Sequence, residues 1–108
     1  MKLMKTIIID VGVYTAIDID LTEFDFTGIE KLILTAKNST DTESPVIFQR
    51  EYTEPIIINE IITPKESLLL RRGAVYDFIS VLVDGKGYKE SSNGSISLRE
   101  GVGRVEQD

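Results

Sequence analysis

The apolar side chains are mostly branched at Cβ, and this feature limits the fold more than any other. Fifteen residues are Ile and eight are Val, whereas only three are Ala and two are Met. Branching at Cβ restricts the χ1 angle and suits a pleated strand, and scarce Ala disfavours a helical bundle. Since 108 residues is the length of one ordinary domain, we expect a single β-rich domain over residues 1–108.

Alternation of apolar and polar residues predicts about seven strands. The clearest example is residues 14–21, where Ile17 and Ile19 alternate with Asp18 and Asp20. The predicted strands are residues 14–21, 30–37, 46–52, 56–58, 74–83, 88–91 and 95–99. Residues 84–87 and the pair Asn93-Gly94 predict tight turns between the last three strands, because glycine supplies the positive φ that such turns require.

One short helix is predicted between the fourth and fifth strands. Thr63 can cap its N-terminus, Pro64 suits the first helical position, and Glu66 completes a capping box. Gly73 then favours a left-handed stop. The expected architecture is an antiparallel β-sandwich with this helix in a crossover.

The composition excludes several kinds of chemistry. The chain has no Cys and no His, which rules out disulfides, thiolate zinc sites, cysteine nucleophiles and Ser-His triads. Its formal charge of −6 repels the phosphate backbone, so we expect no nucleic-acid partner. No stretch approaches the roughly 18 apolar residues of a membrane span, and only three isoleucines follow Lys5 before Asp10. We expect a non-enzymatic protein without a cofactor or a membrane partner, cytoplasmic when expressed.

Asp18 and Asp20 are weak candidates for a metal site. Two residues apart on a strand, their carboxylates point the same way at a spacing of about 6.5–7 Å along the chain. With other acids nearby they could collect a calcium ion, which prefers several oxygen ligands. The alternative is that they form the solvated face of an edge strand, where charge deters unwanted pairing.

The remaining polar residues favour structural roles. Asp77 lies inside the most hydrophobic predicted strand, so we expect it to be tied to the backbone, to Arg71 or to Arg72 rather than to act in catalysis. Ser67 and Ser80 have no His to activate them and are structural by default. Arg71 and Arg72 follow the predicted helix, where they could complement its dipole or meet carboxylates of a partner.

Several segments occur in an order that resembles one protein family. The most characteristic pair is Thr-Pro-x-Glu-Ser at residues 63–67 followed by Gly-x-x-Tyr-Asp at residues 73–77. The other matching segments are residues 29–38, 46–50, 83–88 and 93–96. Over residues 14–100 the chain resembles small prophage proteins of Gram-positive bacteria, which are similar to the immunoglobulin-like modules of phage tail and baseplate components.

The resemblance implies an immunoglobulin-like β-sandwich that serves as a structural module of a virion. It implies partners among other phage structural proteins, self-association into a homo-oligomer, and no catalytic residues. Residues 1–13 are a possible assembly strand, with Ile7, Ile8 and Ile9 as contact residues, and Arg71 and Arg72 are further contact candidates. Residues 101–108 have little to bury and are expected to fray. The alternative function is a ligand-binding β-sandwich that takes carbohydrate or calcium on its acidic face.

Overall fold

The structure is mostly β-strand, with one short α-helix and one turn of 3-10 helix, η1 (Val83–Gly85). It is a computed structural model that describes residues 6–100, with the backbone alone described at 90–92 and 100. Along the chain the elements are β1 (Ile7–Val11), β2 (Thr15–Asp20), β3 (Ile29–Lys37), β4 (Val46–Tyr52), β5 (Ile57–Ile62), α1 (Pro64–Leu69), β6 (Val75–Leu82) and β7 (Tyr88–Glu100). The predicted all-β architecture with one helix is confirmed.

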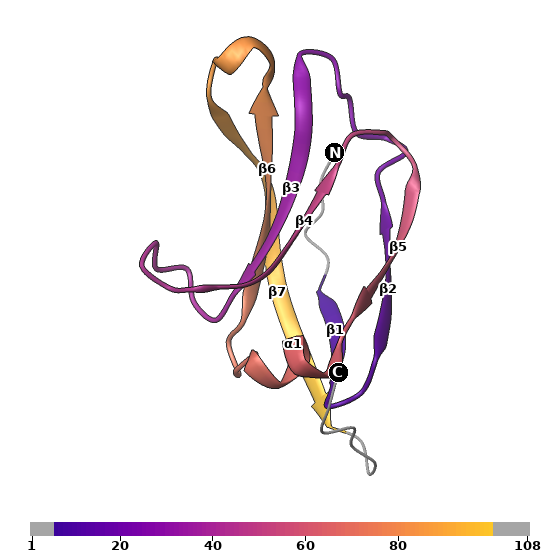
Figure 1. The fold of residues 1–108 in the computed structure, drawn as a ribbon, viewed down its shortest axis with the longest axis vertical. Helices are drawn as coiled ribbons and strands as arrows, with labels where there is room; N and C mark the ends of the chain where they lie inside the picture. Colours follow the sequence, from indigo (N-terminus) through magenta and orange to yellow (C-terminus); the bar gives the residue numbers. More distant parts are fainter. Residues whose placement is uncertain (1–5, 101–108) are drawn as a thin grey trace.

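The strands form two sheets of unequal size. The larger has the order β1-β7-β6-β3-β4, and the smaller contains β2 and β5 alone. Figure 1 shows β2 and β5 standing to one side of the larger sheet, with α1 at the lower end. All neighbours pair antiparallel except β1 and β7, which are parallel, with Ile9 opposite Leu98. The prediction of a purely antiparallel sandwich is therefore wrong at this pair, because the first strand enters beside the last one in the same direction.

The core lies between the two sheets and follows the predicted alternation. In β2 the side chains of Ile17 and Ile19 are buried, whereas Ala16, Asp18 and Asp20 are exposed. The same period places every second residue of β3 and β6 in the core. The buried apolar residues are Ile9, Ile17, Ile19, Leu21, Leu32, Leu34, Ala36, Phe48, Tyr52, Ile62, Leu70, Ala74, Tyr76, Phe78 and Ile96.

The helix α1 begins as its residues predict but ends before the predicted stop. The Thr63 side chain accepts a hydrogen bond from the Glu66 amide, and the Glu66 carboxylate accepts one from the Thr63 amide. These two bonds form the predicted capping box and satisfy amides that the helix leaves without partners. The helix ends at Leu69, and Leu70 caps it in an extended conformation. Gly73 has a φ of +93° but lies in the turn that follows, so the prediction that it stops the helix is wrong.

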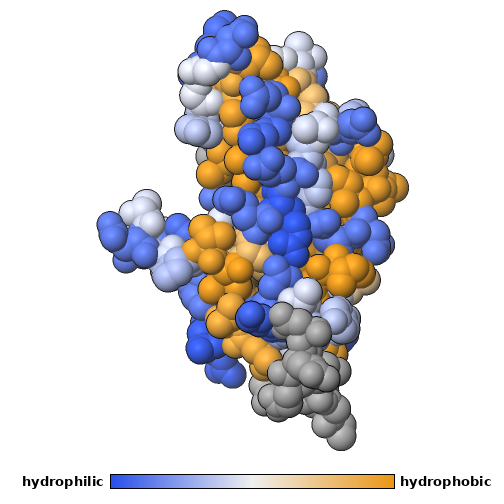
Figure 2. All heavy atoms as spheres, viewed as in Figure 1, coloured by the Kyte–Doolittle hydropathy of each residue, from blue (hydrophilic) through white to orange (hydrophobic). Residues whose placement is uncertain are grey.

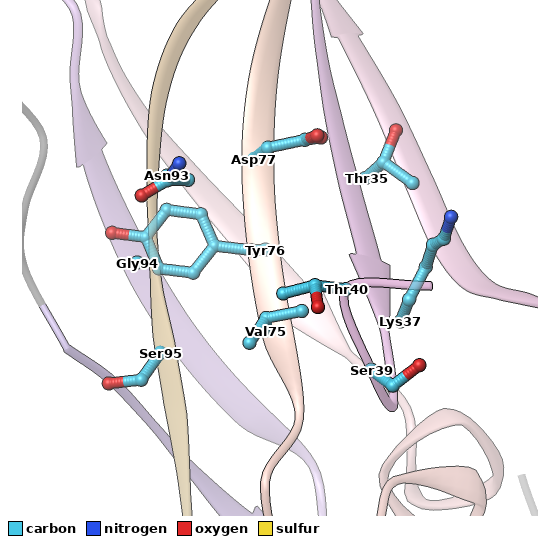
Figure 3. A pocket seen from close by; sticks show the side chains of 10 residues that line it. All are labelled: Thr35, Lys37, Ser39, Thr40, Val75, Tyr76, Asp77, Asn93, Gly94 and Ser95. Atoms are coloured by element: carbon cyan, nitrogen blue, oxygen red, sulfur yellow. The ribbon is translucent and has the colours of Figure 1, made fainter. Parts of the chain in front are cut away.

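One of the two predicted turns near the C-terminus is confirmed and the other is wrong. Residues 84–87 join β6 to β7, with Gly85 and Gly87 at positive φ. Asn93 and Gly94 instead lie within β7, which runs unbroken from Tyr88 to Glu100. Gly94 pairs with Tyr76 of β6, and Figure 3 shows the Tyr76 ring lying against this glycine. A Cβ at position 94 would approach the Tyr76 side chain to 2.6–2.8 Å, so the missing side chain makes room for the ring.

Candidate interaction surface

The outer face of the smaller sheet exposes branched apolar side chains. Ile57 is 63% exposed and Ile61 is 48% exposed, although both belong to the regular strand β5. In the register of the sheet, Asp20 lies opposite Ile57 and Ala16 lies opposite Ile61. We name this surface the outer β2–β5 face, formed by Ala16, Asp18, Asp20, Ile57, Asn59 and Ile61. In Figure 2 apolar surface gathers at the side of the molecule occupied by β2 and β5, interrupted by hydrophilic groups.

The face is exposed because it is the side of the smaller sheet that is turned away from the core. Each strand of the pair has one neighbour in the described chain, so neither is flanked on both sides. A two-stranded sheet of this kind depends on packing through one face, here the core face with Ile17, Ile19 and Ile62. The opposite face receives no such cover from the described residues, and this leaves Ile57 and Ile61 in solvent.

The side chain of Arg50 on β4 binds residues of β5 and α1. Its Nη2 atom lies 3.0 Å and 3.1 Å from the two carboxylate oxygens of Glu66, and its Nε lies 3.2 Å from Oε2 of Glu60. The guanidinium also stacks over the Phe48 ring at 5.2 Å and donates to the Ile61 carbonyl at 3.4 Å. This side chain therefore covers the β5 edge that faces β4, and it connects the two sheets at that seam.

Tyr52 and the partly buried Glu60 lie beside the Arg50 side chain. Tyr52 is buried, and its hydroxyl has no hydrogen-bond partner among the described residues. Burial, reinforced by the nearby Glu60 carboxylate, raises the pKa of the Tyr52 phenol well above its ordinary value. The phenol is therefore neutral at pH 7, and it packs as part of the core.

Asp18 and Asp20 share the outer β2–β5 face as their spacing predicts, but each carboxylate is already used locally. Asp18 Oδ1 accepts a hydrogen bond from Asn59 Nδ2 at 2.6 Å. Asp20 Oδ1 accepts from the amide and hydroxyl of Thr22 at 2.9 Å and 2.6 Å. Within residues 6–100, no group of three or more His, Cys, Asp or Glu side chains is arranged to hold a metal ion.

A second surface feature is a groove at the C-terminal end of α1, which we name the Arg71–Arg72 groove. It has a volume of about 700 Å³. Its lining combines apolar side chains with two arginines: Val11, Leu68, Leu70, Arg71, Arg72, Gly73, Ile96, Ser97 and Leu98. Arg71 Nη1 donates to the carbonyls of Leu68 and Leu70 at 3.0 Å and 3.3 Å, at the end of the helix where carbonyls lack partners. Arg72 is exposed and has no ion pair with any described residue.

A shallow hollow of about 440 Å³ with mixed polar and apolar lining lies on the larger sheet (Figure 3). Asp77 lines it, and the register places this residue opposite Thr35 on β3 and Asn93 on β7. Of the partners expected for Asp77, neither Arg71 nor Arg72 forms an ion pair with it, and the Arg71 guanidinium donates to carbonyls at the end of α1 instead. A tie from Asp77 to the backbone stays a prediction. The groups around the hollow are hydroxyls and amides with one carboxylate and one ammonium group: Thr35, Lys37, Ser39, Thr40, Val75, Tyr76, Asp77, Asn93, Gly94 and Ser95.

The predicted contact residues near the N-terminus belong to β1. Ile9 is completely buried in the core, Ile7 is half-buried, and Ile8 is 51% exposed. All three pair with β7, so the strand proposed for addition to a neighbour is already part of its own sheet. Only the outer edge of β1 and the side chain of Ile8 are left for a partner. Residues 1–5 and 101–108, the remainder of the assembly strand and the expected frayed tail, lie outside the described residues.

Sequence reasoning missed Ile57 and Ile61 as exposed residues. Positions 57, 58, 61 and 62 are all Ile, so both faces of β5 read as apolar and the alternation does not identify the outer one. The signal that could have found them is Asn59, because a polar residue between Ile57 and Ile61 marks the face that meets water.

The chain matches no known family model, and a comparison with curated proteins finds no match. In the described residues, no helix is long and apolar enough to cross a membrane.

Proposed function

We propose that this protein is a non-enzymatic structural module of a phage or prophage particle, tail- or baseplate-associated, that acts through protein–protein assembly. The observation that carries the proposal is the outer β2–β5 face, where two isoleucines are held in solvent on a regular sheet. Large apolar groups exposed together mark interaction sites more often than chance exposure does. The partners we propose are further copies of this chain and other structural proteins of the same particle.

The strand order supports an immunoglobulin-like origin for the module. In immunoglobulin domains, strands G, F, C and C′ are neighbours in one sheet and strands B and E are neighbours in the other. Here β7, β6, β3 and β4 have the first arrangement and β2 and β5 have the second. The helix α1 lies in the connection from β5 to β6, the position of the E–F corner. Strands equivalent to A and D do not flank β2 and β5 in the described chain, which leaves one edge of each of these strands without a strand neighbour.

Substitution of Ile57 and Ile61 by lysine tests the proposal. We expect the double variant I57K/I61K to lose self-association, because burying two ammonium groups in an apolar contact is strongly unfavourable. The measurement is sedimentation velocity of the full chain at several concentrations. The matched control is Val46→Lys, since Val46 is 51% exposed on β4, in the other sheet. Equal association of I57K/I61K and the unmodified chain would contradict the role of this face.

The ligand-binding alternative makes a different prediction. If the acidic face bound calcium or a carbohydrate, calorimetry with calcium and with a glycan panel would give saturable heats. The assembly proposal expects no binding to either, since Asp18 and Asp20 already accept local hydrogen bonds.

A further inference from the structure

We propose that the free edge of β2 pairs with the same edge of β2 in a second copy, antiparallel and with Ala16 opposite Ala16 of that copy. The pairing merges the two small sheets into one of four strands, in the order β5-β2-β2-β5. It adds a contact made by backbone groups to the contact made by the outer β2–β5 face. The inference rests on the proposed function, because both require copies of this chain to associate.

The register of the small sheet shows which backbone groups of β2 lie at its free edge. The Leu21 amide donates to the Ile56 carbonyl at 3.1 Å, and these residues extend the pairing of β2 with β5 by one position. Because bonding alternates along an antiparallel pair, the odd-numbered residues of β2 are the ones that bond to β5. The amides and carbonyls of Ala16 and Asp18 therefore point away from β5, and no other described strand pairs with them.

Side chains of the same chain cover the other three sheet edges. At the β1 edge, the Asp10 amide donates to the Thr15 hydroxyl at 2.9 Å, and this hydroxyl donates to the Asp10 carbonyl at 3.2 Å. Between the β4 and β5 edges, Arg50 donates to the carbonyls of Gln49 and Ile61. Cover of this kind deters pairing with another chain, because it takes up groups that a new strand needs. The described residues supply no such cover at the β2 edge, so this edge is the one open to strand addition.

Like charges select the register of the pairing. The free backbone groups belong to even-numbered residues, so even residues must face each other across the edge. With Asp18 opposite Asp18, or opposite Ala16, the two Asp18 carboxylates would be direct or diagonal neighbours, and like charges so placed destabilise a strand pair. With Ala16 opposite Ala16, the two Asp18 residues are on the order of 13 Å apart along the strands. Each Asp18 then faces Tyr14 of the other copy, which is 56% exposed and carries a hydroxyl that can donate to a carboxylate.

A second copy is the occupant because pairing with it doubles the surface on which the proposed function depends. An antiparallel pair of identical strands has its two-fold axis perpendicular to the sheet, so both outer β2–β5 faces point the same way. Ile61 lies opposite Ala16 in each copy, so a row of four apolar side chains crosses the merged sheet. One face measures on the order of 20 Å by 10 Å, well below the roughly 800 Å² that each partner buries in a standard interface. Two faces side by side reach about half of that area.

Disulfide trapping of the full chain tests the pairing, because the chain has no Cys and each variant then carries one thiol. The Cα atoms of a hydrogen-bonded antiparallel pair lie about 5.5 Å apart, a separation that a disulfide spans. We expect Ala16→Cys to give a covalent dimer under mild oxidation, at a concentration at which the unmodified chain associates. The controls are Asp18→Cys on the same strand and Ser97→Cys on β7, both exposed, and neither should cross-link. The readout is non-reducing electrophoresis, with circular dichroism to show that each variant folds.

A mixture of two variants tests the register. Tyr14 of one copy faces Asp18 of the other, so an equimolar mixture of Tyr14→Cys and Asp18→Cys should form the mixed covalent dimer. Neither variant should cross-link to itself, because its two thiols lie four residues apart along the paired strands. Mass spectrometry distinguishes the mixed dimer from the two self-linked ones. A mixture that gives no mixed dimer would overturn this register.

Proline at the same edge tests the backbone contact without a thiol. Ala16→Pro removes an amide that points away from β5, so no hydrogen bond of the small sheet is lost. We expect association about tenfold weaker than that of the unmodified chain, because each dimer loses two amide donors at its axis. The matched control is Ile8→Pro, since Ile8 lies two positions before Asp10 and its amide also points away from the sheet. This control should associate like the unmodified chain.

The remaining outcomes separate this inference from the proposed function. If the chain associates but Ala16→Cys does not cross-link, the β2 edge meets residues 1–5 or another protein, and the pairing is overturned while the proposed function survives. Cross-linking of Ser97→Cys to the same extent as Ala16→Cys would indicate random collision and would overturn the pairing too. Equal weakening by Ile8→Pro and Ala16→Pro would remove the special role of the β2 edge. A chain that does not associate at all contradicts both proposals.

Discussion

Glycine is required at position 94 of β7 because a side chain there would collide with Tyr76. It is not required for a turn, because the strand continues through this position. The aromatic ring of Tyr76 occupies the space that a Cβ would need. We expect Gly94→Ala to lower the free energy of unfolding by about 1–3 kcal/mol, the usual cost of forcing extra volume into a packed site. Urea unfolding measures this. The control is Asn93→Ala, an exposed strand position that should change stability by less than about 0.5 kcal/mol. A larger loss of stability in Asn93→Ala than in Gly94→Ala would contradict the close contact between Gly94 and the Tyr76 ring.

Tyr52 makes stability depend on pH at the alkaline end. Its pKa in the folded protein is raised by burial, whereas the unfolded chain has the ordinary value of about 10. The unfolded state therefore loses this proton first, and the stability contributed by the neutral phenol is present below about pH 10 and falls as pH rises further. We expect Tyr52→Phe to flatten this fall. At neutral pH it should be as stable as the parent or up to about 1 kcal/mol more stable, because an unpaired buried hydroxyl is removed.

Denaturant unfolding across alkaline pH checks the Tyr52 prediction. Tyr88→Phe is the control, since Tyr88 is exposed and should leave the pH profile unchanged. A Tyr52→Phe profile that coincides with that of the parent would contradict the account of this residue.

At the scale of elements, the parallel pairing of β1 with β7 is marked by one ion pair. Asp10 lies opposite Arg99, and the carboxylate and guanidinium meet at 2.6 Å and 3.1 Å. Arg99 lowers the pKa of the Asp10 carboxyl below its ordinary value. The ion pair therefore contributes stability above about pH 3.9, the value in the unfolded chain, and loses it as pH falls through the folded pKa.

We expect Arg99→Gln to raise the pKa of Asp10 toward its ordinary value, as followed by NMR titration of the side-chain carboxyl. The pKa of Asp25 should not move, because it is lowered by hydrogen bonds from Thr27 and not by Arg99. An Asp10 titration that is the same in Arg99→Gln and the parent would argue against the pairing of β1 with β7.

The elements that sequence predicted well are those fixed by local rules. Alternation located β2, and the Thr63 cap located the start of α1, because both depend on residues a few positions apart. The parallel partner of β1 and the role of Gly94 were not predicted, because each depends on a strand that is distant in sequence. The strand count agrees for two compensating reasons. β1 joins the sheet as an additional strand, and two predicted strands merge into β7.

On the scale of the whole molecule, the candidate interaction surface also depends on contacts between residues distant in sequence, which local patterns do not reveal. Asp18, Asp20, Arg71 and Arg72 were identified from sequence, and the structure places the two pairs on separate surfaces. The apolar part of the outer β2–β5 face was not predicted. Ile occupies both faces of β5, and only the polar Asn59 between Ile57 and Ile61 marks the outer one.

The central claim is that this protein works by associating with copies of itself through exposed surface. The most direct test is the molar mass of the unmodified chain by light scattering on a sizing column, at widely separated concentrations. We expect a mass that rises above the 12.1 kDa of one chain as concentration increases, either continuously or to the value of a closed oligomer. A mass that remains at 12.1 kDa at every concentration would contradict it.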